Sequence, residues 1–205
     1  MLFSDRPIEA LIAAVVALLV GLTFHEFSHA LLADQLGDRR PRAMGRLTLN
    51  PIPHIDPIGA AMMLIAGFGW AKPVLVNPAA LAGGRRGMAV VAVAGPIANV
   101  VVAIAFAVVY RVLDLVGLEQ GFVTELVRLI VAFNMLLALF NLIPIPPLDG
   151  SNVLVAFLPP RQALQFQRYA PYGVFLVLLL IILPNSPLGL LFDLAGATAR
   201  ILIGA

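Results

Sequence analysis

The segment His25-Glu26-Phe27-Ser28-His29 carries two histidines four positions apart, with a glutamate directly after the first. On a helix, residues four apart lie on one face, so both imidazoles can reach a single metal ion. The neighbouring carboxylate can then take a proton from water that the metal activates. The spacing therefore predicts a metal site. The alternative is a structural hydrogen-bond network between two buried histidines and Glu26.

A third ligand must come from elsewhere, because a catalytic zinc takes three protein ligands and keeps one position open. The chain has no cysteine. Asp149 is the first candidate, since it is a carboxylate in an apolar stretch and Gly150 allows close approach. Asp149 could instead cap the helix that follows it, a role that aspartate performs well. His54, the only other histidine, is the second candidate ligand.

These polar residues lie in a very apolar chain of 205 residues, with 61% hydrophobic residues, 12% charged residues and a mean hydropathy of +1.00. Soluble domains are about 25% charged. The composition therefore excludes a disordered chain and most soluble folds, and it indicates an integral membrane protein in contact with the lipid bilayer. The net charge of +2 is too small to imply a polyanion, so no nucleic-acid partner is expected.

Long apolar runs predict an all-α polytopic protein that forms a single domain over residues 1–205. A helix needs about 20 residues to cross the hydrocarbon core. Five spans are expected, the last two as a hairpin: residues 8–33, 88–110, 126–158, 164–183 and 188–203.

Two segments depart from simple spans. Residues 126–158 are too long for one straight helix, and the prolines between 144 and 147 should break it. Irregular backbone at membrane depth must be buried in protein or line a cavity, which makes this break a candidate functional site. Residues 58–70 are apolar but too short to cross, and their glycines favour a re-entrant or strand-like element.

The basic residues predict the orientation. Most Lys and Arg side chains lie in residues 34–87, and cytoplasmic loops are enriched in these residues. We therefore expect this side to be cytoplasmic, with the N-terminus outside, the C-terminus inside and the histidine pair close to the cytoplasmic face.

Several motifs, in order, resemble those of the site-2 proteases, a family of intramembrane zinc metalloproteases. His25-Glu26-x-x-His29 matches the metal motif of that family. The second signature is matched by Asn141-x-x-Pro144-x-x-x-Leu148-Asp149-Gly150, and the element between the two by Gly95-Pro96-Ile97-Ala98-Asn99. The residues from His54 to Gly59 and from Gly69 to Val74 are similar to stretches in compact bacterial members. The motif begins at residue 25, so no PDZ or CBS domain is expected.

The resemblance implies that His25, His29 and Asp149 bind one zinc ion and that Glu26 is the general base. The implied reaction is hydrolysis of a peptide bond in a transmembrane substrate. That reaction serves either regulated intramembrane proteolysis or signal-peptide clearance, in a bacterial or archaeal cell membrane. The alternative is a membrane metal-binding or transport protein that is not a protease. Transport would need ligands along a path across the bilayer, and no second His, Asp or Glu cluster is present in the spans.

Three further residues are candidates for contact with the substrate or the oxyanion. His54 or Asn99 could donate a hydrogen bond to the oxyanion, and Asn141 and the prolines after it could hold an unwound substrate strand. Each also has a plain structural explanation. His54 could be a surface loop residue, Asn99 could bond between helices, and Asn141 could end a helix.

Overall fold

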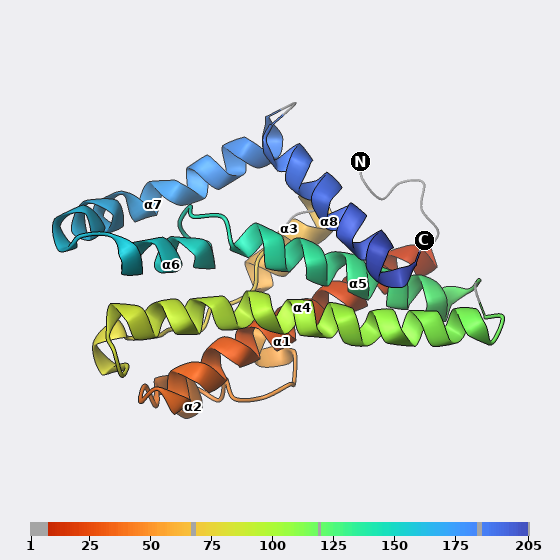
Figure 1. The fold of residues 1–205 in the computed structure, drawn as a ribbon, viewed down its shortest axis with the longest axis horizontal. Helices are drawn as coiled ribbons and strands as arrows, with labels where there is room; N and C mark the ends of the chain where they lie inside the picture. Colours follow the sequence, from red (N-terminus) through yellow and green to blue (C-terminus); the bar gives the residue numbers. More distant parts are fainter. Residues whose placement is uncertain (1–7, 67–68, 119, 184–185, 205) are drawn as a thin grey trace.

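The computed structural model describes residues 8–66, 69–118, 120–183 and 186–204, and helices dominate it (Figure 1). The longest helices are α1 (Ile8–Gln35), α4 (Arg85–Leu115), α5 (Phe122–Asn141) and α7 (Pro160–Ile182). The shorter elements are α2 (Arg40–Ala43), η1 (Ile52–His54), α3 (Pro57–Ala66), η2 (Pro78–Ala80), α6 (Asp149–Phe157) and α8 (Leu188–Ile203).

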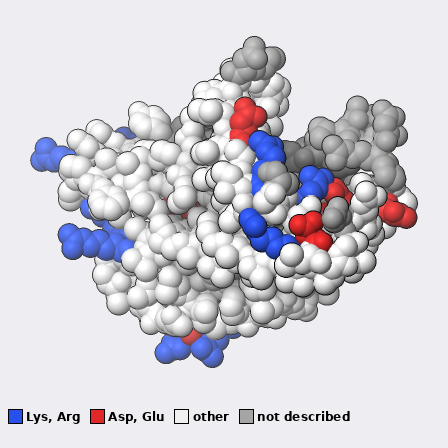
Figure 2. Space-filling model, turned by 45° about the vertical axis from the view of Figure 1, so that its right-hand side comes forward, with Lys and Arg blue, Asp and Glu red and all other residues white. Residues whose placement is uncertain are grey.

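Within the described residues, four helices, α1, α4, α5 and α7, have the length and apolar composition needed to cross a membrane. Helix α8 has 16 residues. At 1.5 Å per residue it is about 24 Å long, shorter than a hydrocarbon core of about 30 Å. The all-α multi-pass fold is therefore confirmed, with four full-length spans and one shorter helix near the expected five. Figure 2 shows the corresponding surface, a broad uncharged area with charged side chains gathered toward its edges.

Helices α1, α4 and α5 pack together and form the core of the molecule. Ala17 of α1, Val102 of α4 and Ile130 of α5 form one buried apolar cluster, and the small side chain of Ala17 is fully buried in it. Small side chains allow membrane helices to approach closely, so these contacts hold the helix backbones in fixed positions. His25, Glu26, His29 and Asn99, described below, project from this three-helix frame.

The predicted break in the third span is present. Helix α5 ends at Asn141 and α6 begins at Asp149, with no helix between them. A Cβ atom on Gly150 would lie 2.2 Å from the carbonyl oxygen of Leu142, so only glycine allows the start of α6 to approach the end of α5 this closely. Helix α6 then packs on α4, which brings Asp149 toward the three-helix frame.

The short apolar segment 58–70, expected to be re-entrant or strand-like, is helical over most of its length. Residues 57–66 form α3, and the described residues contain no strand beyond one isolated antiparallel bridge between Ile55 and Ala71. The strand-like alternative therefore does not hold for α3. We refer to residues 69–77, which are not helical and lead to η2, as the strap.

Helices α7 and α8 do not form the expected hairpin. Arg85, at the start of α4, donates to the carbonyl of Leu158 just before α7, at 3.1 Å. Arg111, near the end of α4, donates to the carbonyl of Leu202 at the end of α8, at 2.8 Å. Helices α7 and α8 therefore run one after the other along α4, from the start of α4 toward its end. The start of α1 and the end of α8 lie at the same end of the molecule (Figure 1).

The physical reason is the packing of α8. Ala199 and Ile203 lie in one apolar cluster with Ala103 and Ala107 of α4 and Val131 of α5. This burial directs α8 along the frame toward the far end of α4, which the apolar composition of the segment alone does not specify.

Candidate metal centre

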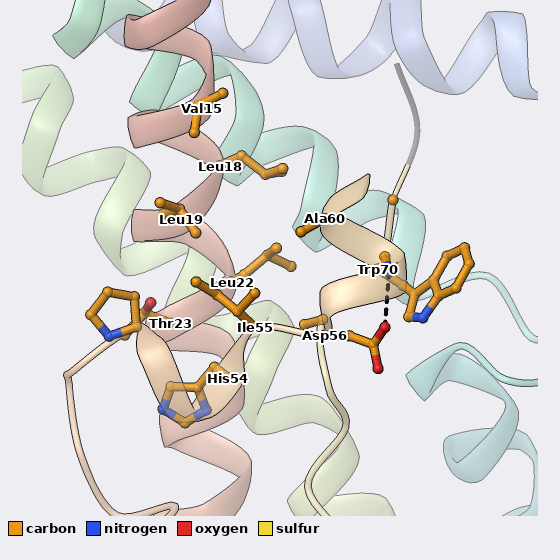
Figure 3. A pocket seen from close by; sticks show the side chains of 14 residues that line it. Val15, Leu18, Leu19, Leu22, Thr23, His54, Ile55, Asp56, Ala60 and Trp70 are labelled. Carbon is orange, nitrogen blue, oxygen red and sulfur yellow. Dashed lines mark hydrogen bonds between the residues drawn. The ribbon is translucent and has the colours of Figure 1, made fainter. Parts of the chain in front are cut away.

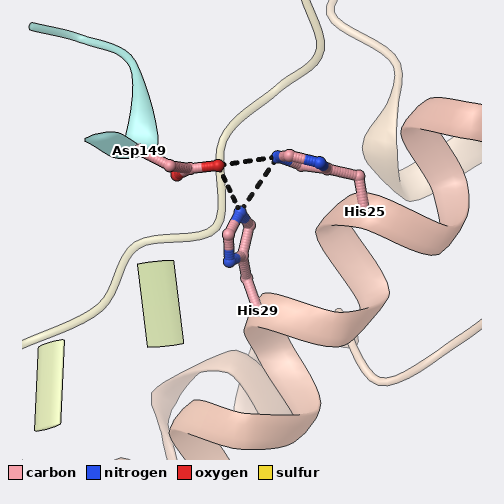
Figure 4. A group of neighbouring side chains, drawn as sticks. All are labelled: His25, His29 and Asp149. Atoms are coloured by element: carbon pink, nitrogen blue, oxygen red, sulfur yellow. Dashed lines mark hydrogen bonds and ion pairs between the residues drawn. The ribbon is translucent and has the colours of Figure 1, made fainter. Parts of the chain in front are cut away.

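Three potential ligand atoms converge between α1 and α6 (Figure 4). The Nε2 atoms of His25 and His29 are 3.0 Å apart. Asp149 Oδ2 lies 3.0 Å from His25 Nε2 and 3.2 Å from His29 Nε2. Both histidines are buried, and both come from the same face of α1, as the four-residue spacing requires.

The arrangement fits a zinc ion. Ligands at about 2.0–2.2 Å in a tetrahedral site lie roughly 3.3 Å from one another, close to the separations observed here. Asp149 Oδ2 is buried and receives no hydrogen bond. Buried polar atoms nearly always have partners, so a cation at the centre of the three atoms accounts for their convergence.

The other ring nitrogen of each histidine sets its tautomer. His25 Nδ1 lies 2.6 Å from Asn99 Oδ1, and His29 Nδ1 lies 2.8 Å from the carbonyl oxygen of Val91. Both partners are carbonyl oxygens, so each Nδ1 carries the proton and each Nε2 presents a lone pair. Such partners orient metal-binding histidines and raise their basicity.

Asn99 is itself held by three helices. It is fully buried, and its Nδ2 donates to the carbonyl of Gly21 at 2.9 Å and to Asn134 Oδ1 at 2.8 Å. Asn134 in turn donates to the carbonyl of Ile130 at 2.8 Å. Asn134 was not among the residues predicted from the sequence. In the sequence it stands out only as an uncharged polar residue within an apolar span.

Gly95 provides the space for the imidazoles. A Cβ atom at this position would lie 2.6 Å from both His25 Cε1 and His29 Nε2. The Gly-Pro pair of α4 therefore brings helix backbone directly against the ligand group.

Glu26 lies beside the ligands in a cavity of about 180 Å³. It is 8% exposed, and its Oε2 accepts a hydrogen bond of 3.0 Å from the backbone N–H of Val74 in the strap. The same cavity is lined by Asn141, Asn152 and Pro147. The carboxylate is thus oriented by the strap and open to the cavity that the ligands share.

The strap is fixed on both sides of Val74. Lys72 donates its N–H to the carbonyl of His54 at 2.9 Å, and Arg46 Nη1 donates to the carbonyl of Lys72 at 3.1 Å. Asn77 donates its N–H to Asp38 Oδ2 at 2.7 Å. Hydrogen bonds from the Arg40 guanidinium, together with that of Asn77, hold the pKa of the Asp38 carboxyl well below its usual range.

The remaining candidates lie apart from the ligand group. His54 is 2% exposed, and its Nε2 lies 2.9 Å from the carbonyl oxygen of Thr48. It is outside the group of three ligand side chains that the described residues bring together. Asn141 donates to the carbonyl of Leu137 at 3.0 Å, where α5 ends, and it also lines the cavity with Glu26.

Comparisons with known proteins agree on one family. The model of peptidase family M50 matches residues 117–183. The chain is 36% identical over 187 residues to "Putative zinc metalloprotease YwhC" of Bacillus subtilis, which covers 89% of this chain and 85% of that protein. It is 30% identical over 199 residues to "Putative zinc metalloprotease Rip2" of Mycolicibacterium smegmatis, and this match covers 87% of this chain and 71% of that protein. It is 32% identical over 208 residues to "Putative zinc metalloprotease Rip2" of Mycobacterium tuberculosis (strain H37Rv), and this match covers 93% of this chain and 76% of that protein. No solved structure matches the chain.

Proposed function

Because this chain belongs to peptidase family M50, the site-2 proteases, we propose that this zinc metalloprotease cleaves peptide bonds of membrane-embedded substrates. The observation that carries the proposal is the meeting of His25, His29 and Asp149 next to Glu26. Two of these ligands and Glu26 lie on a helix long enough to cross the membrane. The chain acts as one metalloprotease domain.

His25, His29 and Asp149 hold the zinc ion in this proposal. Zinc bound there supplies Lewis acidity, which makes water more acidic and polarises a peptide carbonyl. Asn99 and the carbonyl of Val91 keep both Nε2 lone pairs directed at the metal.

Glu26 is the general base. Its carboxylate takes a proton from the attacking water as the new carbon–oxygen bond forms at the substrate carbonyl. It then passes this proton to the amide nitrogen as the carbon–nitrogen bond breaks, so that the amine leaves neutral. The N–H of Val74 orients Glu26 and balances its charge during the first transfer.

The candidates for an oxyanion donor have different roles in this account. Both N–H groups of Asn99 are donated to Gly21 and Asn134, so we assign Asn99 to positioning His25. His54 donates from Nε2 to Thr48, and it is discussed below. Asn141 and the non-helical residues 142–148 lie beside the cavity, where extended backbone can pair with an unwound substrate.

The active site opens toward the cytoplasm in this proposal. The ligands contact the half of α4 near Val91 and Gly95, which follows the basic residues Arg85 and Arg86. Basic residues favour the cytoplasmic side. Both ends of the chain would then lie outside, because the start of α1 and the end of α8 share the opposite end of the molecule.

Cleavage of synthetic transmembrane peptides in detergent micelles, followed by mass spectrometry, tests the proposal. Wild type should cut the peptides, and Glu26→Gln should not cut them although it keeps zinc. Glu9→Gln, at the exposed start of the same helix, is the matched control and should cut like wild type. Cleavage by Glu26→Gln at the wild-type rate would overturn the assignment of the base.

A further inference from the structure

A second cavity, of about 200 Å³, lies on α1 away from the metal ligands (Figure 3). Val15, Leu18, Leu19 and Leu22 form its wall on α1, and Ala60 of α3 and Trp70 of the strap lie across from them. The four α1 positions follow the i, i+3, i+4, i+7 spacing of one helix face. The cavity is therefore apolar along its length.

This cavity and the one beside Glu26 are lined by the same two elements, α1 and the strap. Glu26 is one turn beyond Leu22 on α1, about 6 Å along the helix axis. The strap lines both spaces, because Trp70 and Ala71 face the apolar cavity and Pro73 and Val74 face the cavity with Glu26. A peptide lying along the strap would therefore pass from one cavity to the other.

His54 provides a polar group at the end of the apolar cavity, below Leu22 and Thr23 (Figure 3). Its Nε2 faces the carbonyl oxygen of Thr48 at 2.9 Å, so Nε2 carries the proton. Nδ1 is then a hydrogen-bond acceptor, and it is buried with no partner. An acceptor cannot stabilise an oxyanion, so His54 is not the oxyanion donor in this proposal.

We infer that this cavity is a substrate subsite for a large apolar side chain, such as Leu or Phe. The inference rests on the proposed proteolysis and specifies which residue flanks the cut. The volume is sufficient, because an apolar cavity of about 150 Å³ already holds benzene.

Photo-crosslinking tests the cavity without depending on catalysis. The probe is a synthetic transmembrane peptide with photo-leucine placed at each position in turn, bound to the Glu26→Gln protein in micelles. One position should label residues of the cavity wall. Ala60→Phe fills the cavity from an exposed position and should abolish that labelling. Ala61→Phe, the next exposed residue of α3, is outside the cavity and should leave the labelling intact.

The outcomes separate this inference from the proposed function. Labelling of the cavity by the peptide, with no cleavage by wild type, would support the subsite and overturn the proteolysis. Cleavage by wild type with labelling elsewhere, or with labelling unaffected by Ala60→Phe, would overturn the subsite alone. Labelling of the cavity by photoactivatable phosphatidylethanolamine and not by the peptide would show that a lipid occupies it, and the inference would be wrong.

Discussion

Asn99 Oδ1 lies 2.6 Å from His25 Nδ1, although the two residues are 74 positions apart and belong to different helices. The contact links His25, a candidate metal ligand on α1, to α4, and through Asn134 to α5. The orientation of one ligand therefore depends on the packing of all three helices of the frame.

Replacing Asn99 by leucine should reduce zinc affinity by about 10- to 100-fold, the usual effect of losing such a partner. The proton on His25 Nδ1 would have no acceptor, so its Nε2 would no longer be held toward the metal. Competition with a chelator measures this affinity. Ser28→Ala, which removes only a bond to the carbonyl of Phe24, should retain wild-type affinity. Equal affinities in all three proteins would contradict the positioning role of Asn99.

Gly95→Ala should abolish zinc binding, although alanine is the better helix former. Its methyl group would lie 2.6 Å from atoms of both His25 and His29 and would displace the rings. Zinc content of the purified variant is the measurement. Gly189→Ala in α8 adds the same group in open space and should bind zinc normally. Retention of zinc by Gly95→Ala would show that α4 can move away from the ligands.

Val74→Pro should lower the rate of peptide cleavage by at least about tenfold while zinc stays bound. Proline has no N–H, so Glu26 would lose the charge-assisted hydrogen bond that orients it. Single-turnover cleavage rates measure the effect. Val74→Ala keeps the N–H and should cleave at close to the wild-type rate. A rate for Val74→Pro equal to that of Val74→Ala would remove Val74 from the mechanism.

Asp38→Asn should destabilise the protein near neutral pH by about 1–3 kcal/mol, because the charged carboxylate accepts bonds from Arg40 and from the end of the strap. The pKa of Asp38 is lower in the folded state than in the unfolded state, so protonation weakens folding. The difference from wild type should be complete above about pH 5 and should shrink as pH falls below the ordinary value of about 3.9. Thermal unfolding in micelles checks this, and a difference that grows on acidification would contradict it.

The candidate ligands could be predicted from the sequence because their signals are local. Two histidines at helical spacing share a face on any helix, and a carboxylate after a proline-rich break is conspicuous in an apolar chain. Asn134 could not be predicted in the same way. A single amide in a span has ordinary uses between helices, and only the folded arrangement places it against Asn99.

The errors in the fold prediction arose where distant contacts decide the structure. Helix α8 was expected to return beside α7, but its Ala199 and Ile203 pack on α4 and α5, and Arg111 binds its last carbonyls. For residues 58–70, the glycines left a strand-like element as one alternative to a re-entrant one. Gly59 instead lets α3 lie against the backbone of Trp70, where a Cβ would be 2.1 Å from the carbonyl oxygen.

We expect His25, His29 and Asp149 to hold zinc and Glu26 not to be a ligand. Elemental mass spectrometry of the purified wild type, Asp149→Ala and Glu26→Gln tests it directly, without a known substrate. The account predicts one zinc per chain in wild type and Glu26→Gln, and loss of zinc in Asp149→Ala. Full zinc content in Asp149→Ala, or a wild type that cannot be loaded with zinc, would contradict it.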